Sequence, residues 1–127
     1  MELQGIPAIV TGGASGLGAG AARALARGGA RVTIFDMNMD GARAVAAEIG
    51  GLAVECNVAD AASGEAAIAA ARQAHGPVGI CVNCAGVGTA GRIVGRDGPM
   101  ALDAYAKVIQ VNLIGTFNIL RLAAADM

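Results

Sequence analysis

The stretch "IVTGGASGLGAGAARAL" (Ile9–Leu25) carries five glycines between an apolar run and an alanine-rich run. Glycine is a poor residue for a helix interior, so its repetition needs a reason. Gly12, Gly16 and Gly18 have the spacing Gly-x-x-x-Gly-x-Gly, which favours a tight turn after a strand and a close approach of the backbone to an anion. Close packing of the helix on the strand is the other explanation. We expect Ser15 to cap a helix whose N-terminus binds a pyrophosphate.

Strands and helices are predicted to alternate along the rest of the chain. Strands are expected over residues 8–10, 31–36, 52–58 and 79–83. Helices are expected from residue 15 to the "RGGA" at 27–30, over 40–49, from an N-cap at Asp60 to the "HGP" at 75–77, and from about residue 102. A long glycine-rich loop is expected over residues 84–99. The alternation predicts an α/β fold with a doubly wound, parallel, Rossmann-like sheet in one domain.

The composition argues against several classes of protein. The 127 residues carry nine basic and ten acidic side chains, interspersed, with a net charge of -1 and no basic block. Nucleic-acid binding is therefore not expected. The start of the chain lacks the basic region of a signal or transit peptide, and no continuous apolar run has the length of a membrane span. We therefore expect a cytoplasmic protein with no membrane partner, whose 55% hydrophobic residues form a sheet buried on both faces.

The cysteines, the histidine and the tyrosine do not predict a metal or redox centre. The three cysteines include the pair Cys81 and Cys84 in "CVNC", but residues three apart in a strand point to opposite faces. We expect reduced thiols and no metal ligands. His75 is expected at a helix C-terminus or in solvent, and Tyr105 on the surface or in packing.

Polar or glycine-rich motifs follow three further strands. Asp36 ends the second strand, 18 residues after Gly18, which is about the distance at which dinucleotide-binding folds place a carboxylate on a ribose. Asn57 ends the third strand, and "NCAG" at residues 83–86 ends the fourth. Because ligands of parallel sheets bind at the carboxyl ends of the strands, these motifs predict one dinucleotide site.

These motifs resemble the short-chain dehydrogenase/reductase family. "TGGASGLG" resembles the family's Thr-Gly-x-x-x-Gly-x-Gly signature, and "NCAG" resembles its Asn-Asn-Ala-Gly signature with Cys84 in place of the second asparagine. "VNLIGTFN" resembles the helix that carries a conserved asparagine, here Asn112. Together with "NILRLAA", these stretches are most similar to the subgroup of type II 3-hydroxyacyl-CoA dehydrogenases. The resemblance covers essentially the whole chain.

The resemblance implies an NAD site and one catalytic residue. The cofactor-binding residues that it implies are Gly12, Ser15, Gly16, Leu17 and Gly18 at the pyrophosphate, Asp36 at the adenosine ribose, Asn57 and Val58 at the adenine, and Cys84, Ala85 and Gly86 at the nicotinamide ribose. Asn57 stands where the family usually has aspartate, so its bond to the adenine amine loses the assistance of a charge. Asn112 is implied to hold a water molecule in a proton relay.

The family's other catalytic residues, a serine and a Tyr-x-x-x-Lys motif, do not occur in this chain. We therefore expect the dinucleotide-binding part of a single domain that continues beyond residue 127, in an enzyme that interconverts a secondary alcohol and a ketone. The resemblance implies 3-hydroxyacyl-CoA as substrate, a role in fatty acid metabolism and a homotetramer. The loop at 86–99 is expected to form a wall of the substrate pocket, with Arg92 or Arg96 near a coenzyme A phosphate. The alternative is a non-catalytic NAD-binding sensor or regulatory module.

Overall fold

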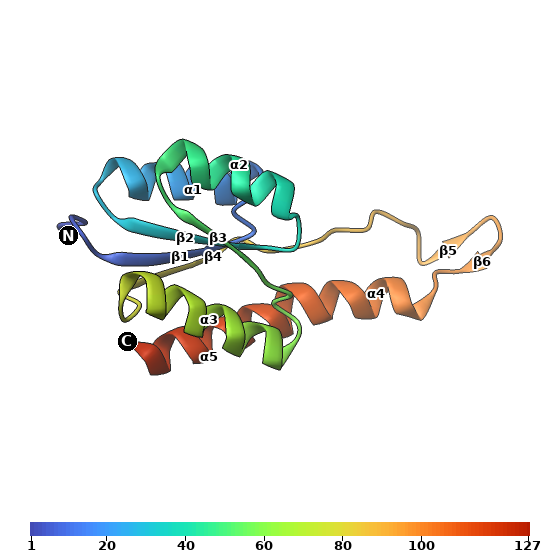
Figure 1. The fold of residues 1–127 in the computed structure, drawn as a ribbon. Coiled ribbons are helices and arrows are strands. Elements are labelled where there is room, and N and C mark those ends of the chain that lie inside the picture. Colours follow the sequence, from blue (N-terminus) through green and yellow to red (C-terminus); the bar gives the residue numbers. More distant parts are fainter.

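The computed structural model describes all of residues 1–127 and contains a parallel sheet between two layers of helices (Figure 1). The strands β1 (Pro7–Thr11), β2 (Arg31–Asp36), β3 (Leu52–Glu55) and β4 (Ile80–Asn83) lie in the order β3-β2-β1-β4. The helices α1 (Gly16–Arg27) and α2 (Met39–Ile49) cover one face, and α3 (Ala61–His75) and α5 (Thr116–Asp126) cover the other. This arrangement confirms the predicted doubly wound α/β fold.

Small aliphatic side chains fill both faces of the sheet. Val10, Val32 and Ile34 pack against alanines of α1 and α2, and Ile9 and Phe35 pack against α3 and α5. Gly64 of α3 lies so close to α5 that an added Cβ would meet the Asn118 side chain at 2.9 Å. The small side chains therefore let helices lie close to the sheet and to each other.

Local capping signals set several helix ends where the sequence places them. The Asp60 carboxylate accepts a hydrogen bond from the Ser63 N–H at 2.7 Å, as expected for an N-cap. Gly50 ends α2 in the left-handed conformation with a φ of 64°. Ser15 occupies the N-cap position of α1, but its side chain caps no backbone N–H. The expected capping bond of Ser15 is therefore absent, and its hydroxyl is free to bind another group.

The third strand is shorter than expected, because the chain leaves the sheet after Glu55. The Asn57 side chain accepts a hydrogen bond from the Ala59 N–H, and the Asn57 N–H donates to the Ser63 hydroxyl. These local bonds replace strand pairing and turn the backbone towards α3. The prediction of a strand through residue 58 is wrong for residues 56–58, which instead form the edge of a cavity described below.

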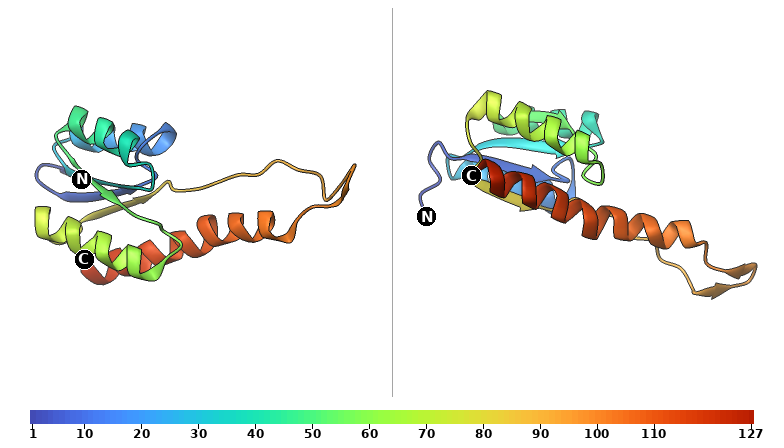
Figure 2. Two further views of the ribbon diagram at one scale, coloured as in Figure 1. Left: turned by 45° about the vertical axis from the view of Figure 1, so that its right-hand side comes forward. Right: turned by 90° about the horizontal axis from the view of Figure 1, so that it is seen from below.

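The glycine-rich loop contains a hairpin that the sequence analysis does not predict. Strands β5 (Val94–Gly95) and β6 (Gly98–Pro99) pair in an antiparallel arrangement, and Gly98 has a φ of 121°. The hairpin lies at the end of an arm that extends away from the sheet in all views (Figures 1 and 2). The Asp-Gly step at residues 97–98 is a typical turn signal that could have indicated it.

The last helical segment is one continuous rod with a wider turn in its middle. It consists of α4 (Leu102–Ile109), the π-helical segment η1 (Gln110–Gly115) and α5. Figure 2 shows that α5 lies under the sheet whereas α4 extends beyond it. The rod is anchored at Asn118, whose side chain is buried and donates to the Val58 carbonyl oxygen at 2.8 Å.

This rod is also long and apolar enough to span a membrane, with a mean hydropathy of 1.4 over 18 residues. No such span is expected from the sequence, because no continuous apolar run has the necessary length. Length and composition alone do not distinguish a membrane span from a helix that packs on a sheet. Here Ile119 and Ala123 pack into the core, while 22% of the residues in that window are buried.

His75 ends α3 as expected, and its ring also contacts the sheet. Its Nδ1 lies 3.2 Å from the hydroxyl oxygen of Thr33, which is fully buried in β2. Partial burial lowers the pKa of His75, and the nearby Arg31 guanidinium lowers that pKa further. The lowered pKa favours the neutral ring beside Thr33. A helix C-terminus would instead favour the protonated ring.

Candidate functional site

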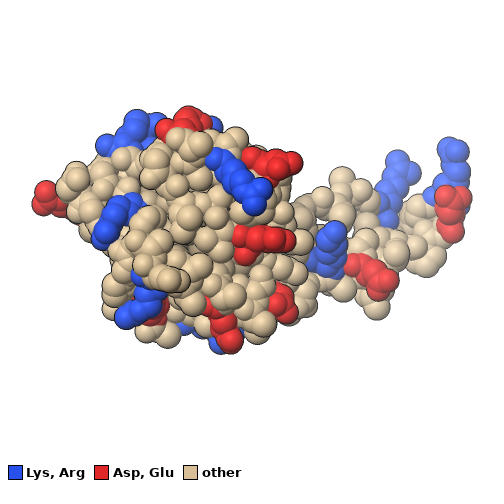
Figure 3. Space-filling model, viewed as in Figure 1, with Lys and Arg blue, Asp and Glu red and all other residues tan.

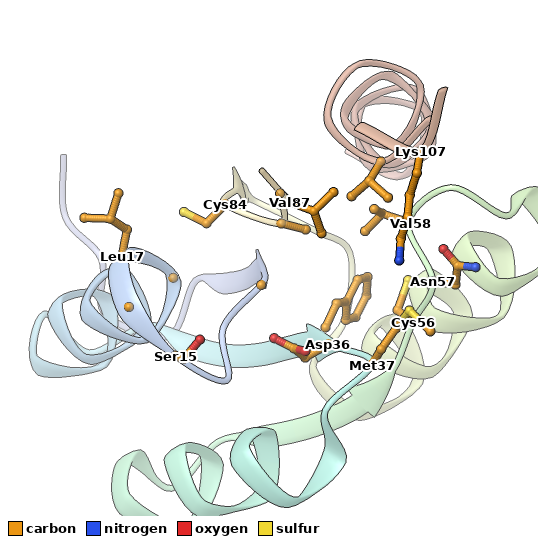
Figure 4. Close-up of a pocket in the computed structure, with 17 residues that line it drawn as sticks. Ser15, Leu17, Asp36, Met37, Cys56, Asn57, Val58, Cys84, Val87 and Lys107 are labelled. Atoms are coloured by element: carbon orange, nitrogen blue, oxygen red, sulfur yellow. The ribbon is translucent and has the colours of Figure 1, made fainter. Parts of the chain in front are cut away.

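A cavity of about 500 Å³ lies at the carboxyl ends of β1, β2 and β4 (Figure 4). The N-terminus of α1 borders one end, and the segment after β3 borders the other. Its volume falls within the range of small-molecule and cofactor sites. The lining residues are Gly12, Ser15, Gly16, Leu17, Gly18, Phe35, Asp36, Met37, Cys56, Asn57, Val58, Cys84, Ala85, Gly86, Val87, Lys107 and Val111.

The turn between β1 and α1 needs glycine at three positions, for different reasons. Gly12 and Gly16 have φ values of 65° and 53°, which other residues rarely adopt. Gly18 is buried in the first turn of α1, where an added Cβ would collide with the carbonyl oxygen of Gly12. The spacing Gly-x-x-x-Gly-x-Gly therefore marks a tight turn and a close helix–strand contact, as expected.

This turn presents unpaired hydrogen-bond donors to the cavity. The N–H groups of Gly16, Leu17 and Gly18 have no backbone acceptor, as is usual for the first turn of a helix. The Ser15 hydroxyl has no partner either, and Ser15, Gly16 and Leu17 are exposed. Free N–H groups and the positive end of the helix dipole favour an anion. The turn thus fits a phosphate group in both shape and charge.

Asp36 lies in the middle of the cavity, at the end of β2. One carboxylate oxygen accepts from the Ala14 N–H at 3.0 Å, and the other accepts from the Asn38 N–H at 2.9 Å. These bonds fix the carboxylate between the glycine turn and the turn that leads into α2. Each oxygen keeps a further lone pair towards the cavity, so the carboxylate can still accept hydrogen bonds from a ligand hydroxyl.

The far end of the cavity is built from the segment that leaves β3. The Asn57 amide oxygen already accepts from Ala59, and the Val58 N–H has no partner in the chain. Cys56 is buried, and this burial raises the pKa of its thiol, so the thiol stays protonated at neutral pH. This end offers backbone and amide groups together with an apolar wall, as a flat base requires.

The loop after β4 is held against the glycine turn by Thr11. The Thr11 hydroxyl oxygen accepts from the N–H groups of Cys84 at 3.1 Å and Ala85 at 3.0 Å. A Cβ added at Gly12 would meet the Ala85 backbone at 2.8 Å, so the two turns are in direct contact. Residues 84–86 therefore line the cavity beside the glycine turn, and their role at a nicotinamide ribose stays a prediction.

Asn112 lies in the π-helical segment and does not line the cavity. Its amide oxygen accepts from the Val87 N–H and its amide nitrogen donates to the Val87 carbonyl oxygen, both at 2.8 Å. Asn112 thus fixes the loop after β4 to the long helix. The water relay that the resemblance implies for Asn112 stays a prediction, since its side chain is engaged with Val87.

All the predicted cofactor-binding residues line this one cavity. Sequence reasoning missed six others, of which Phe35, Met37, Cys56 and Val87 directly adjoin predicted cofactor-binding residues. Val111 and Lys107 could have been found, since they lie one and five positions before Asn112 and share a helix face with each other. The remaining lining positions are predicted in part because they end strands or begin a helix, and in part because the family resemblance implies them.

Most of the loop expected to form a substrate wall lies away from this cavity, and its role at a substrate stays a prediction. Only Gly86 and Val87 of residues 86–99 line the cavity, and the hairpin with Arg92 and Arg96 lies away from it (Figure 1). Residues 88–99 make too few contacts to hold them near the sheet, and their apolar side chains Ile93 and Val94 are exposed. No three side chains of His, Cys, Asp or Glu lie close enough to hold a metal ion, and the three cysteines are unpaired.

A parallel sheet between two layers of helices, with a glycine turn after β1 and a cavity at the carboxyl ends of the strands, defines a protein of the Rossmann-like class. The comparison with family models is more specific. Residues 7–127 match the model of the short chain dehydrogenase family, and the chain belongs to that family of oxidoreductases.

Relatives and solved structures agree with this family. The chain is 35% identical over 130 residues to 3-hydroxyacyl-CoA dehydrogenase type-2 of Homo sapiens, covering 99% of this chain and 50% of the relative. It is 42% identical over 121 residues to D-threitol dehydrogenase of Mycolicibacterium smegmatis, covering 91% of this chain and 45% of the relative. The chain thus spans about half the length of these curated relatives.

A solved structure of 3-ketoacyl-(acyl-carrier-protein) reductase from Brucella melitensis, complexed with NADH, superimposes with a TM-score of 0.86 at 36% identity. The match covers 94% of this chain and 48% of the reductase chain. The agreement in both fold and sequence supports the family assignment over nearly the whole chain.

The glycine turn gives a prediction with an internal control. Gly18→Ala should lower the free energy of unfolding by about 2 kcal/mol or more, because the added Cβ collides with the Gly12 carbonyl. Gly20→Ala on the same helix meets nothing within 4 Å and should raise that free energy by about 0.5–1 kcal/mol. Urea unfolding of both variants measures the difference. Equal stabilities would contradict the close packing of α1 on β1.

Proposed function

We propose that this chain supplies the NAD site of an oxidoreductase that interconverts a secondary alcohol and a ketone. The observation that carries the proposal is the Asp36 carboxylate, fixed midway between a phosphate-binding turn and a base-sized end of the cavity. The family is one of oxidoreductases, and a related structure contains NADH. A dinucleotide has groups of matching type at matching positions: phosphates, ribose hydroxyls and a base.

A nicotinamide dinucleotide supplies hydride transfer when it is bound. In this proposal the residues of the chain bind and orient the cofactor. The N–H groups of the first turn of α1 and the Ser15 hydroxyl hold the pyrophosphate, and Asp36 accepts hydrogen bonds from the adenosine ribose. Asn57 and Val58 contact the adenine. Cys84, Ala85 and Gly86 lie along the nicotinamide ribose, on a loop that Thr11 and Asn112 hold in place.

Asp36 favours NAD over NADP. A 2′-phosphate on the ribose would lie close to the carboxylate, and like charges about 4 Å apart repel by about 4 kcal/mol at an effective dielectric constant near 20. The fixed position of Asp36 prevents it from turning away, because both of its oxygens are bound to backbone N–H groups. No cationic residue among positions 37–39 offsets the repulsion.

The substrate proposed for the whole protein is a 3-hydroxyacyl-CoA. The proposal rests on the residues shared with that subgroup and on the similarity to 3-hydroxyacyl-CoA dehydrogenase type-2 over 99% of this chain. D-threitol dehydrogenase is also similar to this chain, so a polyol is the alternative substrate whose oxidation should be compared with that of 3-hydroxyacyl-CoA. The role in fatty acid metabolism and the cytoplasmic location are parts of the same proposal, and the unpaired cysteines are compatible with a reducing compartment.

We further propose that the protein is a homo-oligomer that associates through the long helical rod, with a tetramer as the state that the resemblance implies. Five large side chains lie along one side of the rod at helical spacing and are 51–77% exposed. These five residues, the rod stripe, are Leu102, Tyr105, Leu113, Phe117 and Leu120. An exposed apolar stripe of this kind marks an interaction site, and a second copy of the rod offers a matching surface.

The cofactor prediction is tested by titrating NAD and NADP separately. NAD should bind at least about 100-fold more tightly, which allows for partial screening of the repulsion. Asp36→Ala should narrow this ratio, whereas Asp40→Ala, which removes an exposed carboxylate outside the cavity, should leave the ratio unchanged. Similar dissociation constants for NAD and NADP with the unaltered chain would contradict the proposal. Thermal unfolding of the Asp36 variant checks that its fold is intact.

Turnover distinguishes the enzyme from a non-catalytic NAD-binding module. The chain 1–127 should bind NAD without oxidising 3-hydroxybutyryl-CoA, because Tyr105 lies outside the cavity and no other group here is placed to take the hydroxyl proton. NADH absorbance measures this. Turnover above the uncatalysed rate would mean that a catalytic group has been missed. For the whole protein, preference for D-threitol would overturn the substrate, and NAD binding without any oxidation would favour the module.

The oligomer prediction is tested by placing charges on the rod stripe. The double variant Leu113→Glu, Phe117→Glu should shift the mass measured by light scattering towards the monomer, since buried carboxylates oppose association. Ile93→Glu is the matched control, because Ile93 is 85% exposed but lies on the arm. An unchanged mass for the double variant, or an equal effect of Ile93→Glu, would exclude the rod stripe as the contact.

A further inference from the structure

Lys107 is the only lysine of the chain, and none of the bonds described above accounts for its position. It lies on α4, is exposed and lines the cavity, and its side chain forms neither a hydrogen bond nor an ion pair. Arg23 and Arg72, in contrast, are paired with Glu48 and Asp126. An unpaired ammonium group at the edge of a cavity is free to bind a ligand.

The register of the long helix places Lys107 over the far end of the cavity. Val111, one turn further along, packs against the core, and a Cβ on Gly115 would meet the Val58 side chain at 2.6 Å. These contacts set the face that the helix turns towards the segment after β3. Figure 4 shows the Lys107 side chain extending from this helix past Val58, with its amine on the side of Cys56 and Asn57.

The groups of the segment after β3 that can hydrogen-bond a purine are all uncharged. The Val58 N–H can donate one hydrogen bond, and the Asn57 amide oxygen, already bound to Ala59, can accept one more. An adenine edge presents ring nitrogens that accept and an amino group that donates. The Asn57 amide nitrogen also has N–H groups free to donate, but Lys107 is the only lining side chain with a charged donor.

The two charged residues that line the cavity lie at different places in it. Asp36 is fixed at the middle by the Ala14 and Asn38 N–H groups, and Lys107 is at the far end. The phosphate-binding turn lies at the opposite end, on α1. Lys107 therefore faces the end of the cavity where the purine base of the proposed cofactor would lie. A pyrophosphate on the glycine turn would instead be bound by the free N–H groups of α1.

We propose that Lys107 is a cofactor-binding residue that holds the purine base, donating a hydrogen bond from its Nζ to a ring nitrogen. The proposal rests on the NAD site proposed above and adds to it a residue on a separate helix. Lys107 reaches the base end of the cavity from the long helix, on the side of Cys56 and Asn57 (Figure 4). It also adds a charge-assisted hydrogen bond to the base, which Asn57 as a neutral residue does not provide, because a hydrogen bond from an ammonium group is stronger than one from an amide.

Binding measurements with parts of the cofactor test this assignment. Calorimetry should show that Lys107→Met weakens NAD and ADP-ribose about fivefold to tenfold, a moderate loss because the site is partly exposed to solvent. Nicotinamide mononucleotide, which has a phosphate but no purine, should bind with unchanged affinity. Lys107→Arg keeps the donors and should retain most of the affinity. Arg43→Met removes an exposed charge from α2 outside the cavity and is the matched control.

A single lysine also allows the contact to be observed directly. Reductive methylation with 13C-formaldehyde labels only Lys107 and the N-terminal amine, and the dimethylated lysine keeps one N–H donor. Adenosine, which is uncharged, should shift the lysine signal in the NMR spectrum, whereas nicotinamide mononucleotide should not. A shift with adenosine supports a contact to the base and not a general attraction of phosphates.

Three results would overturn the assignment while leaving the NAD site intact. NAD could bind equally well to the unaltered chain and to Lys107→Met. The variant could lose affinity equally for NAD and nicotinamide mononucleotide, which would indicate general attraction of anions. It could lose much more affinity for NADP than for NAD, which would place Lys107 at the 2′-phosphate. Absence of NAD binding to the unaltered chain would overturn both this assignment and the proposed function.

Discussion

The structure of the site depends on the close contact between two backbone turns. The turn after β1 touches the turn after β4, where a Cβ on Gly12 would lie 2.8 Å from the Ala85 backbone. The same turn touches its own helix, where Gly18 packs on the Gly12 carbonyl. Neither contact leaves room for a side chain, so the strand, the helix and the neighbouring loop take one arrangement. That arrangement directs the free N–H groups of α1 into the cavity.

Asp36 extends this constraint to the second βα unit. Its carboxylate accepts from Ala14 in the first turn and from Asn38 at the start of α2, so one side chain connects two turns that are far apart in sequence. The same carboxylate is the central polar group of the proposed cofactor site. A residue that both orders the turns and binds the ligand makes the geometry of the site independent of the ligand, which reduces the entropy lost on binding.

The long helix adds the fourth side of the cavity from a distant part of the chain. Its wider turn at residues 110–115 brings Gly115 against Val58 and Asn112 against Val87, so two loops of the site are fastened to one helix. π-helical turns occur often at functional sites. The stretch before it, α4, extends beyond the sheet and carries both Lys107 and part of the rod stripe. One helix thus connects the proposed cofactor site with the proposed oligomer contact.

The sequence by itself determined the features that depend on neighbouring residues. The alternating apolar runs, the Asp60 cap, the Gly50 stop and the glycine spacing after β1 predicted four βα units and the residues at their ends. Because parallel strands bring their carboxyl ends to one edge, these local signals also predicted which turns would form a site. The family resemblance then supplied the roles of the individual residues, which local patterns do not contain.

Only the tertiary structure decided the features that depend on packing between distant segments. Lys107 joins the cavity because Val111 and Gly115 set the rotation of a helix some fifty residues away from Asn57 and Val58. Asn112 lies beside Val87 because a π-helical turn shifts the register of that helix, which its sequence does not show. The arm at residues 88–99 leaves the cavity because its own hairpin bonds satisfy it and no core contact holds it. Each of these outcomes depends on contacts between segments that are distant in sequence. A local sequence pattern does not specify which surfaces meet.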